Sequence, residues 1–175
     1  MPLTLYEAFV PTCRQLLGAV ANLLDKAEAH CGEHGWEPER IIGARLSPDM
    51  FDFAYQVKSC YTHSLMALEK AQEGEFGPNL EEAPRTFAGL KAVIADTIAG
   101  LDALDPEAVN AMQGKDADFR FKTFHLPFTA ENFLLSFAQP NFHFHTAMTY
   151  AILRMLGVEV GKFDYLGTMR LKEEA

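Results

Sequence analysis

The residues best suited to chemistry lie in one short polar and aromatic run, Asn141-Phe142-His143-Phe144-His145-Thr146. Histidine titrates near neutral pH and can act as a general base, a proton donor or a metal ligand. Residues two positions apart on an α-helix point about 200° apart, so His143 and His145 cannot both face one pocket. Steps of four and three join His145 to Thr149 and Ile152. The spacing therefore predicts that His145 and Thr149 face the interior and that His143 faces outward.

A second polar group lies on the flank of an earlier apolar segment. Asp52, Gln56 and His63 are separated by four and seven residues, which places them on one side of a helix. We expect them to look into a groove beside the helix that carries His145. His125, in a predicted hairpin, could cover one end of this groove. Histidines that converge from separate elements could hold a divalent cation (zinc, nickel, manganese or iron) with an open position for water.

The same residues also have a purely structural interpretation. His145 could donate to a backbone carbonyl in the core, while His63 and His125 stay half-exposed. His145→Leu should then be tolerated or stabilising, because it removes a buried polar group together with its need for a partner. Other chemistries find little support, since the sequence has no GxSxG, glycine-rich phosphate loop or HExxH. Cys60 lies on an apolar stripe, where burial makes a thiol inert.

Apolar stripes with steps of three and four predict the helices that must position these residues. The first helix begins at a capping box formed by Thr4 and Glu7, and Pro11 is expected to kink or restart it. The second begins at Ser47-Pro48-Asp49, which has the residue types of a helix start. It ends before the loop at Gly74–Pro84.

The second half of the chain supplies two more helices and a change of period. Apolar residues from Phe87 to Leu104 predict the third helix. Alternating residues from Asp118 to about Pro127 predict a small β-hairpin. Thr129 caps the fourth helix, which Pro140 kinks or restarts and which Gly157 ends in a left-handed cap. Four helices with two long loops predict an all-α four-helix bundle with at least one crossover.

The length and composition fit a single domain over residues 1–175. Apolar residues make up 49 % of the chain and charged residues 22 %, the balance of an ordinary globular protein. The formal net charge of −9 argues against nucleic acid and membrane partners, because it repels phosphate backbones and anionic lipid. Three cysteines without paired spacing, and the lack of a signal-like or long apolar segment, predict a cytoplasmic protein.

Three segments near the C-terminus carry a family resemblance: Pro140–Ala147, Tyr150–Arg154 and Gly157–Gly167. Leu23–Glu28 and Gln56-Val57 extend it toward the N-terminus. The chain resembles a bacterial family of unknown function, DUF1993, within the DinB/YfiT-like superfamily. This resemblance implies an up-down-down-up four-helix bundle, here with a small hairpin before the last helix, and commonly a homodimer.

The resemblance also has implications for the site. Many members of the superfamily hold a divalent metal with one histidine of the second helix and an HxxxH pair on the fourth, and some use it to activate a small thiol. Here His63 lies on the helix that would supply the first ligand. Thr149 stands four residues after His145, and Ala147 four after His143. A metal would therefore need His125, a carboxylate or water as a substitute ligand.

Two functions remain open. In the first, the chain binds a small molecule in the groove between the second and fourth helices, and the metal site is degenerate or absent. In the second, it is a divalent-metal-dependent enzyme of the DinB-like thiol transferase or isomerase type, with His145 as a base or ligand. Thiol chemistry rests on analogy of fold, so the sequence leaves enzymatic activity undecided.

Overall fold

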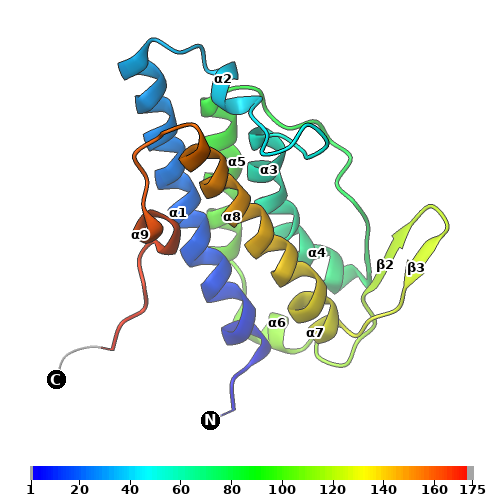
Figure 1. The fold of residues 1–175 in the computed structure, drawn as a ribbon. Coiled ribbons are helices and arrows are strands. Elements are labelled where there is room, and N and C mark those ends of the chain that lie inside the picture. Colours follow the sequence, from blue (N-terminus) through cyan, green and yellow to red (C-terminus); the bar gives the residue numbers. More distant parts are fainter. Residues whose placement is uncertain (1, 173–175) are drawn as a thin grey trace.

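Four helical rods run side by side in the computed structural model, which describes residues 2–172 (Figure 1). The rods are α1 (Leu5–His34), α3 (Phe53–Thr62) continued by α4 (Leu65–Glu73), α5 (Phe87–Asp102) and α8 (Gln139–Met155). α1 and α8 run in one direction, and α3–α4 and α5 run in the other (Figure 1). α1 and α3 each pack against both α5 and α8. The predicted up-down-down-up bundle is confirmed.

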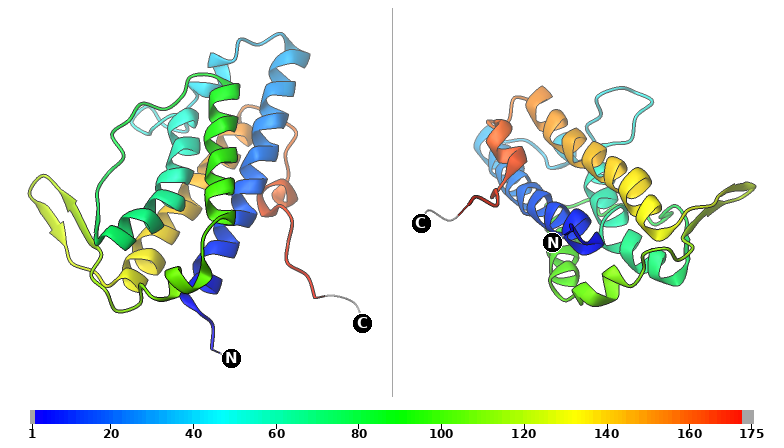
Figure 2. Two further views of the ribbon diagram at one scale, coloured as in Figure 1. Left: turned by 180° about the vertical axis from the view of Figure 1, so that it is seen from behind. Right: turned by 90° about the horizontal axis from the view of Figure 1, so that it is seen from below.

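Shorter elements connect the rods. They are α2 (Glu39–Ile42), β1 (Glu75–Phe76), α6 (Pro106–Asn110), β2 (Asp118–Phe121), β3 (Phe124–Leu126), α7 (Ala130–Asn132), a π-helical stretch η1 (Phe133–Ala138) and α9 (Lys162–Leu166). The segment between α4 and α5 returns along the length of the bundle, so that both rods run in the same direction (Figure 2). We call this segment, residues 74–86, the crossover. None of the described helices is long and apolar enough to cross a membrane.

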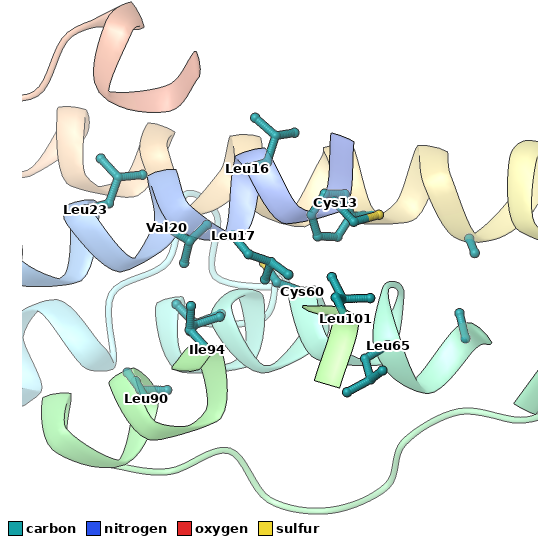
Figure 3. Close-up of a cluster of buried hydrophobic side chains, with 14 of the residues drawn as sticks. Cys13, Leu16, Leu17, Val20, Leu23, Cys60, Leu65, Leu90, Ile94 and Leu101 are labelled. Carbon is teal, nitrogen blue, oxygen red and sulfur yellow. The ribbon is translucent and has the colours of Figure 1, made fainter. Parts of the chain in front are cut away.

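The space between the rods is filled by apolar side chains. Figure 3 shows Leu17, Val20, Cys60 and Ile94 gathered where α1, α3 and α5 meet, and each is at most 1 % exposed. Burial raises the pKa of the Cys60 thiol far above its usual range, so this group stays protonated. The interior of the bundle is therefore an apolar medium in which any polar side chain needs a partner.

The first helix is continuous across its proline. Thr4 and Glu7 form the predicted capping box. Pro11 removes one backbone donor, yet α1 runs from Leu5 to His34 without a break. Val10 and Cys13, on either side of the proline, are fully buried against the bundle, and this packing outweighs the lost hydrogen bond.

The second helix starts later than its residue types predict. Ser47 donates to the Asp49 carboxylate, and the surrounding residues form turns rather than a helix. α3 begins at Phe53 because Asp52 accepts the backbone N–H of Tyr55 at 3.0 Å and caps the first turn. The predicted start was wrong because two cap-like residues lie five positions apart and only the second precedes a buried apolar stripe.

The second helix is also interrupted where one continuous helix was expected. α3 ends at Thr62 with His63 as its C-cap, and α4 begins at Leu65 after Ser64. The Ser64 hydroxyl donates to the carbonyl of Cys60 at 2.5 Å and so satisfies a carbonyl that the break leaves free. The break places His63 at a helix end rather than in mid-helix.

The predicted hairpin is confirmed and belongs to a three-stranded sheet. β2 and β3 pair antiparallel with Arg120 opposite His125. β1, in the crossover, pairs parallel with β2. This pairing brings the crossover against the segment that precedes α8.

The last rod begins and ends at the residues that the sequence marks. Pro140 is the second residue of α8, which restarts after η1. At the other end Gly157 has φ +84°, and the backbone N–H of Val158 donates to the carbonyl of Leu153 at 3.0 Å. Val158 is buried, as expected for a left-handed helix cap with its hydrophobic contact. The predicted domain spans residues 1–175, of which residue 1 and residues 173–175 lie outside the described part.

We expect Gly157→Ala to lower the free energy of unfolding by about 1 kcal/mol, because alanine is strained at a positive φ. Gly32→Ala is the matched control: Gly32 lies in α1 with no atom within 4 Å of an added Cβ. It should raise stability by up to about 1 kcal/mol. Urea unfolding of both variants measures the difference, and equal stabilities would contradict the assigned cap.

Candidate functional site

The polar centre of the bundle is a hydrogen bond between α3 and α8. Nδ1 of His145 lies 2.7 Å from Oε1 of Gln56. The Gln56 side chain is buried, and its Nε2 donates to the carbonyl of Phe51 at 3.0 Å, which orients the amide. A carbonyl oxygen can only accept, so Nδ1 of His145 carries the hydrogen. In the neutral ring, Nε2 is then the basic nitrogen.

His145 is buried, as its place on the helical stripe predicts, and only 8 % of the residue is exposed. Burial lowers the pKa of His145 to about 4, so the ring is neutral at pH 7. The Thr149 hydroxyl donates to the carbonyl of His145 at 3.0 Å. The structure thus brings Gln56, His145 and Thr149 together, with Thr149 bound to the helix backbone rather than to the imidazole.

His63 lies beside His145. The centroids of the two rings are 5.3 Å apart, and their planes differ by 12°. Burial, followed by the neighbouring His145, lowers the pKa of His63 to about 3. Nδ1 of His63 is buried and has no hydrogen-bond partner among the described residues. The site therefore holds two neutral imidazoles, one of them with an unsatisfied nitrogen.

A cavity of about 170 Å³ opens next to His63. We call it the His63 cavity. Its polar wall comes from α3 and the crossover, and its apolar wall comes from β1, β2 and η1; the lining residues are Tyr55, Lys58, Ser59, Thr62, His63, Phe76, Pro78, Asn79, Phe119 and Phe137. The cavity lies on the α3 side of the groove that the sequence predicts.

Lys58 is a buried residue of the polar wall that sequence reasoning missed. It is 5 % exposed, and its Nζ donates to the carbonyls of Asn79 at 3.1 Å and Glu81 at 2.6 Å. Burial lowers the pKa of Lys58, and the Glu81 carboxylate opposes this effect. A lysine on a helix is usually exposed, so no sequence signal marks it. Its burial follows from the crossover, which covers α3.

Two predicted site residues lie elsewhere. Asp52 caps α3 and pairs with Arg85 at 2.8 Å, so it stabilises the helix start and the end of the crossover. His125 is exposed on the hairpin and pairs with the carboxylate of Asp118. The expectation that His125 covers one end of the groove was wrong, because the hairpin projects away from the bundle (Figure 1).

The comparisons with known proteins identify the family. The model of a domain of unknown function, DUF1993, matches residues 5–166. The chain belongs to the DUF1993 family. A crystal structure of a DinB family member protein from Shewanella denitrificans is similar, with a TM-score of 0.81 and 27 % identity over 97 % of this chain and 96 % of that one. No curated protein matches. The DUF1993 chain is thus a DinB-like bundle, as the resemblance implied.

The donor atoms of this DUF1993 chain fall short of a resident divalent cation. The described residues contain no group of three or more His, Cys, Asp or Glu side chains placed to hold a metal. Thr149 stands four residues after His145, at the position where the resemblance implies the second histidine of an HxxxH pair. His63 and His145 supply at most two ligands, whereas catalytic sites commonly have three from the protein.

A further histidine pair of the DUF1993 chain was not among the predicted site residues. His30 and His34 have the i, i+4 spacing on α1, and their rings stack with centroids 3.9 Å apart. Nε2 of His30 is buried without a partner in the described structure. The spacing of four was visible in the sequence and could have found the pair. These residues lie at the end of α1, in a region separate from the His63 cavity.

The Gln56–His145 bond changes the expected result for His145→Leu. The single variant leaves Oε1 of Gln56 buried without a donor, so we expect a loss of about 2 kcal/mol rather than tolerance. Gln56→Met in the same chain removes that unpaired oxygen and should restore at least half of the loss. Urea unfolding of the wild type, both single variants and the double variant measures the coupling. Additive effects of the two changes would show that the bond contributes nothing.

Acid should destabilise the fold through the two neutral histidines. Their pKa values are about 3 for His63 and about 4 for His145, below the usual 6.5, so the unfolded chain binds the protons more tightly. The stabilisation is complete above about pH 6.5 and is lost as pH falls toward 4. At pH 5 the loss should be roughly 1–2 kcal/mol per histidine.

His63→Phe tests this assignment because it keeps a ring beside Phe76 and Phe137 and removes the titrating nitrogen. The variant should lose less stability than the wild type between pH 7 and pH 5, with the losses at the buried His145 and the half-buried His143 remaining. Phe124→Leu, an exposed apolar change on the hairpin, is the control and should follow the wild type. An unchanged pH profile for His63→Phe would contradict the buried neutral state.

Proposed function

We propose that this chain binds a small molecule in the groove between α3 and α8, at the His63 cavity, without a resident metal. The observation that carries the proposal is a pair of buried polar atoms, Nδ1 of His63 and Oγ1 of Thr62. Both lack a hydrogen-bond partner among the described residues, and both belong to residues that line the cavity.

Unpaired polar atoms are costly in a protein interior. Each such atom loses its hydrogen bonds to water and typically costs about 1–3 kcal/mol. A chain that keeps two of them beside one cavity gains if a ligand supplies the partners. The opposite wall, with Phe76, Phe119 and Phe137, offers apolar contact. A few polar groups facing an apolar wall are the usual composition of a small-molecule site.

The neutral histidines suit hydrogen bonding to a ligand, because each ring then has one nitrogen that donates and one that accepts. His145 is held by Gln56, and its ring lies 5.3 Å from that of His63. This packing supports the His63 ring at the cavity wall. In the proposal His145 is a positioning residue, and His63 offers its nitrogen to the ligand.

A fragment screen tests the proposed function. Protein with ¹³C-labelled histidine is titrated with a library of small fragments, and the ring resonance of His63 is followed by NMR. We expect a subset of fragments to shift His63 saturably and to lose this effect in His63→Phe while the fold is retained. His125→Phe should bind as the wild type does. A library with no fragment that shifts His63 would contradict the proposal.

A divalent-metal-dependent enzyme of the DinB-like thiol transferase or isomerase type is the second candidate. The observation in its favour is the proximity of the His63 and His145 rings. Metal analysis after purification without a nickel column separates the candidates. Stoichiometric zinc, nickel, manganese or iron that is lost in His145→Ala would support this enzyme and contradict the first proposal. Metal-free protein with unchanged stability in chelator would contradict the second.

A homodimer is also part of the proposal. α8 exposes Phe144 and Met155, at 48 % and 51 %, on the side opposite the buried stripe. Such exposed apolar side chains are common at interfaces between subunits. Sedimentation equilibrium should therefore give twice the chain mass, and a monomer at micromolar concentration would contradict this part. The cytoplasmic location stays a prediction.

A further inference from the structure

We propose that the ligand of the His63 cavity is a short-chain monocarboxylate, with its carboxylate at Lys58 and Thr62 and its hydrocarbon tail against the phenylalanine wall. This inference rests on the proposed function, since it names the ligand class of the same cavity. It is carried by the charge, the hydrogen-bond donors and the size of the cavity.

The charge of the cavity favours an anion. Lys58 is 5 % exposed, and no carboxylate of the described chain forms an ion pair with its Nζ. The Glu81 carboxylate acts on Lys58 without an ion pair, so the buried cation is only partly compensated and a ligand carboxylate would offset the remaining cost. A ligand amine would add a second positive charge beside Lys58 and should be rejected.

The donors fit the two oxygens of one carboxylate. An ammonium has three N–H groups, and Lys58 donates two of them to the carbonyls of Asn79 and Glu81. One N–H therefore remains. Thr62 stands four residues after Lys58, on the same face of α3, and its buried hydroxyl has no partner in the described structure. Charge-assisted bonds from such donors are stronger than neutral ones.

Size and wall composition limit the rest of the ligand. A volume of about 170 Å³ corresponds to roughly five or six water molecules, which leaves room for a few carbon atoms beyond the carboxylate. The tail would meet Phe76, Phe119 and Phe137, whose ring centroids lie 5.2–6.2 Å apart. His63 is neutral, so Lys58 is the one cation among the lining residues. A single positive charge suits a monoanion better than a phosphate dianion.

The experiment compares three probes of nearly equal size: butyrate, butyramide and butylamine. Each is titrated into the wild-type chain while the His63 ring and Thr62 methyl resonances are followed by NMR. We expect butyrate to shift both groups saturably. Butyramide should bind about tenfold more weakly, because it lacks the charge, and butylamine should not bind.

Two variants locate the carboxylate. Lys58→Met should weaken butyrate binding about tenfold, whereas Lys115→Met, an exposed lysine away from the cavity, should leave it unchanged. Lys58 also holds the crossover, so Lys58→Met could loosen the fold. Thr62→Val keeps the side-chain shape and removes an unpaired hydroxyl, so it should keep or raise stability while weakening butyrate binding several-fold.

The outcomes separate this inference from the function on which it rests. Equal affinity for butyrate and butyramide, or unchanged butyrate affinity in Thr62→Val, overturns the carboxylate assignment. Fragments that shift His63 while butyrate does not also overturn it, and the small-molecule site stands. If neither butyrate nor any fragment of the library shifts the His63 ring resonance, both the carboxylate assignment and the small-molecule site are overturned.

Discussion

One hydrogen bond between two rods determines the state of the site. Gln56 and His145 are 89 residues apart, and their side chains meet in the buried seam between α3 and α8. The seam excludes water, so the histidine must find a partner inside the protein. Because that partner is a carbonyl oxygen, the bond selects one neutral tautomer, and burial keeps the ring neutral by lowering its pKa. The neighbouring His63 is then neutral as well, since it is buried beside this ring.

The position of the cavity follows from two interruptions of regular structure. His63 caps the C-terminal end of α3, so its ring lies at a helix end beside the cavity rather than within a packed turn. The crossover then covers α3 and is held there by Lys58. β1 in the crossover pairs with β2 and brings Phe76 and Phe119 to the opposite wall. Beside this cavity Gln56 holds Nδ1 of His145 and Thr149 stands four residues further on, so the two imidazoles have no third metal-ligating side chain next to them among the described residues.

Local signals in the sequence were enough for the four rods and for several of their ends. The Thr4 and Glu7 box, the Gly157 cap and the inward phase of His145 depend on residues within one or two turns, and the structure has all three. The helix start at Ser47 was wrong, because tertiary burial chooses between two competent caps. Lys58 and the Gln56 partner of His145 could not be predicted, because the crossover and the meeting of α3 with α8 decide them. His125 illustrates the same limit, since the direction of the hairpin depends on the strand pairing.

The protonation of His145 tests the account most directly. Long-range ¹H–¹⁵N NMR of the folded chain distinguishes the two neutral tautomers of a histidine ring from the charged form. At pH 6 the account predicts a neutral His145 ring with its hydrogen on Nδ1, and the same spectrum in Gln56→Met should lose this preference. A His145 ring that is charged at pH 6 would contradict its buried neutral state, and a neutral ring with its hydrogen on Nε2 would contradict the bond on which the site depends.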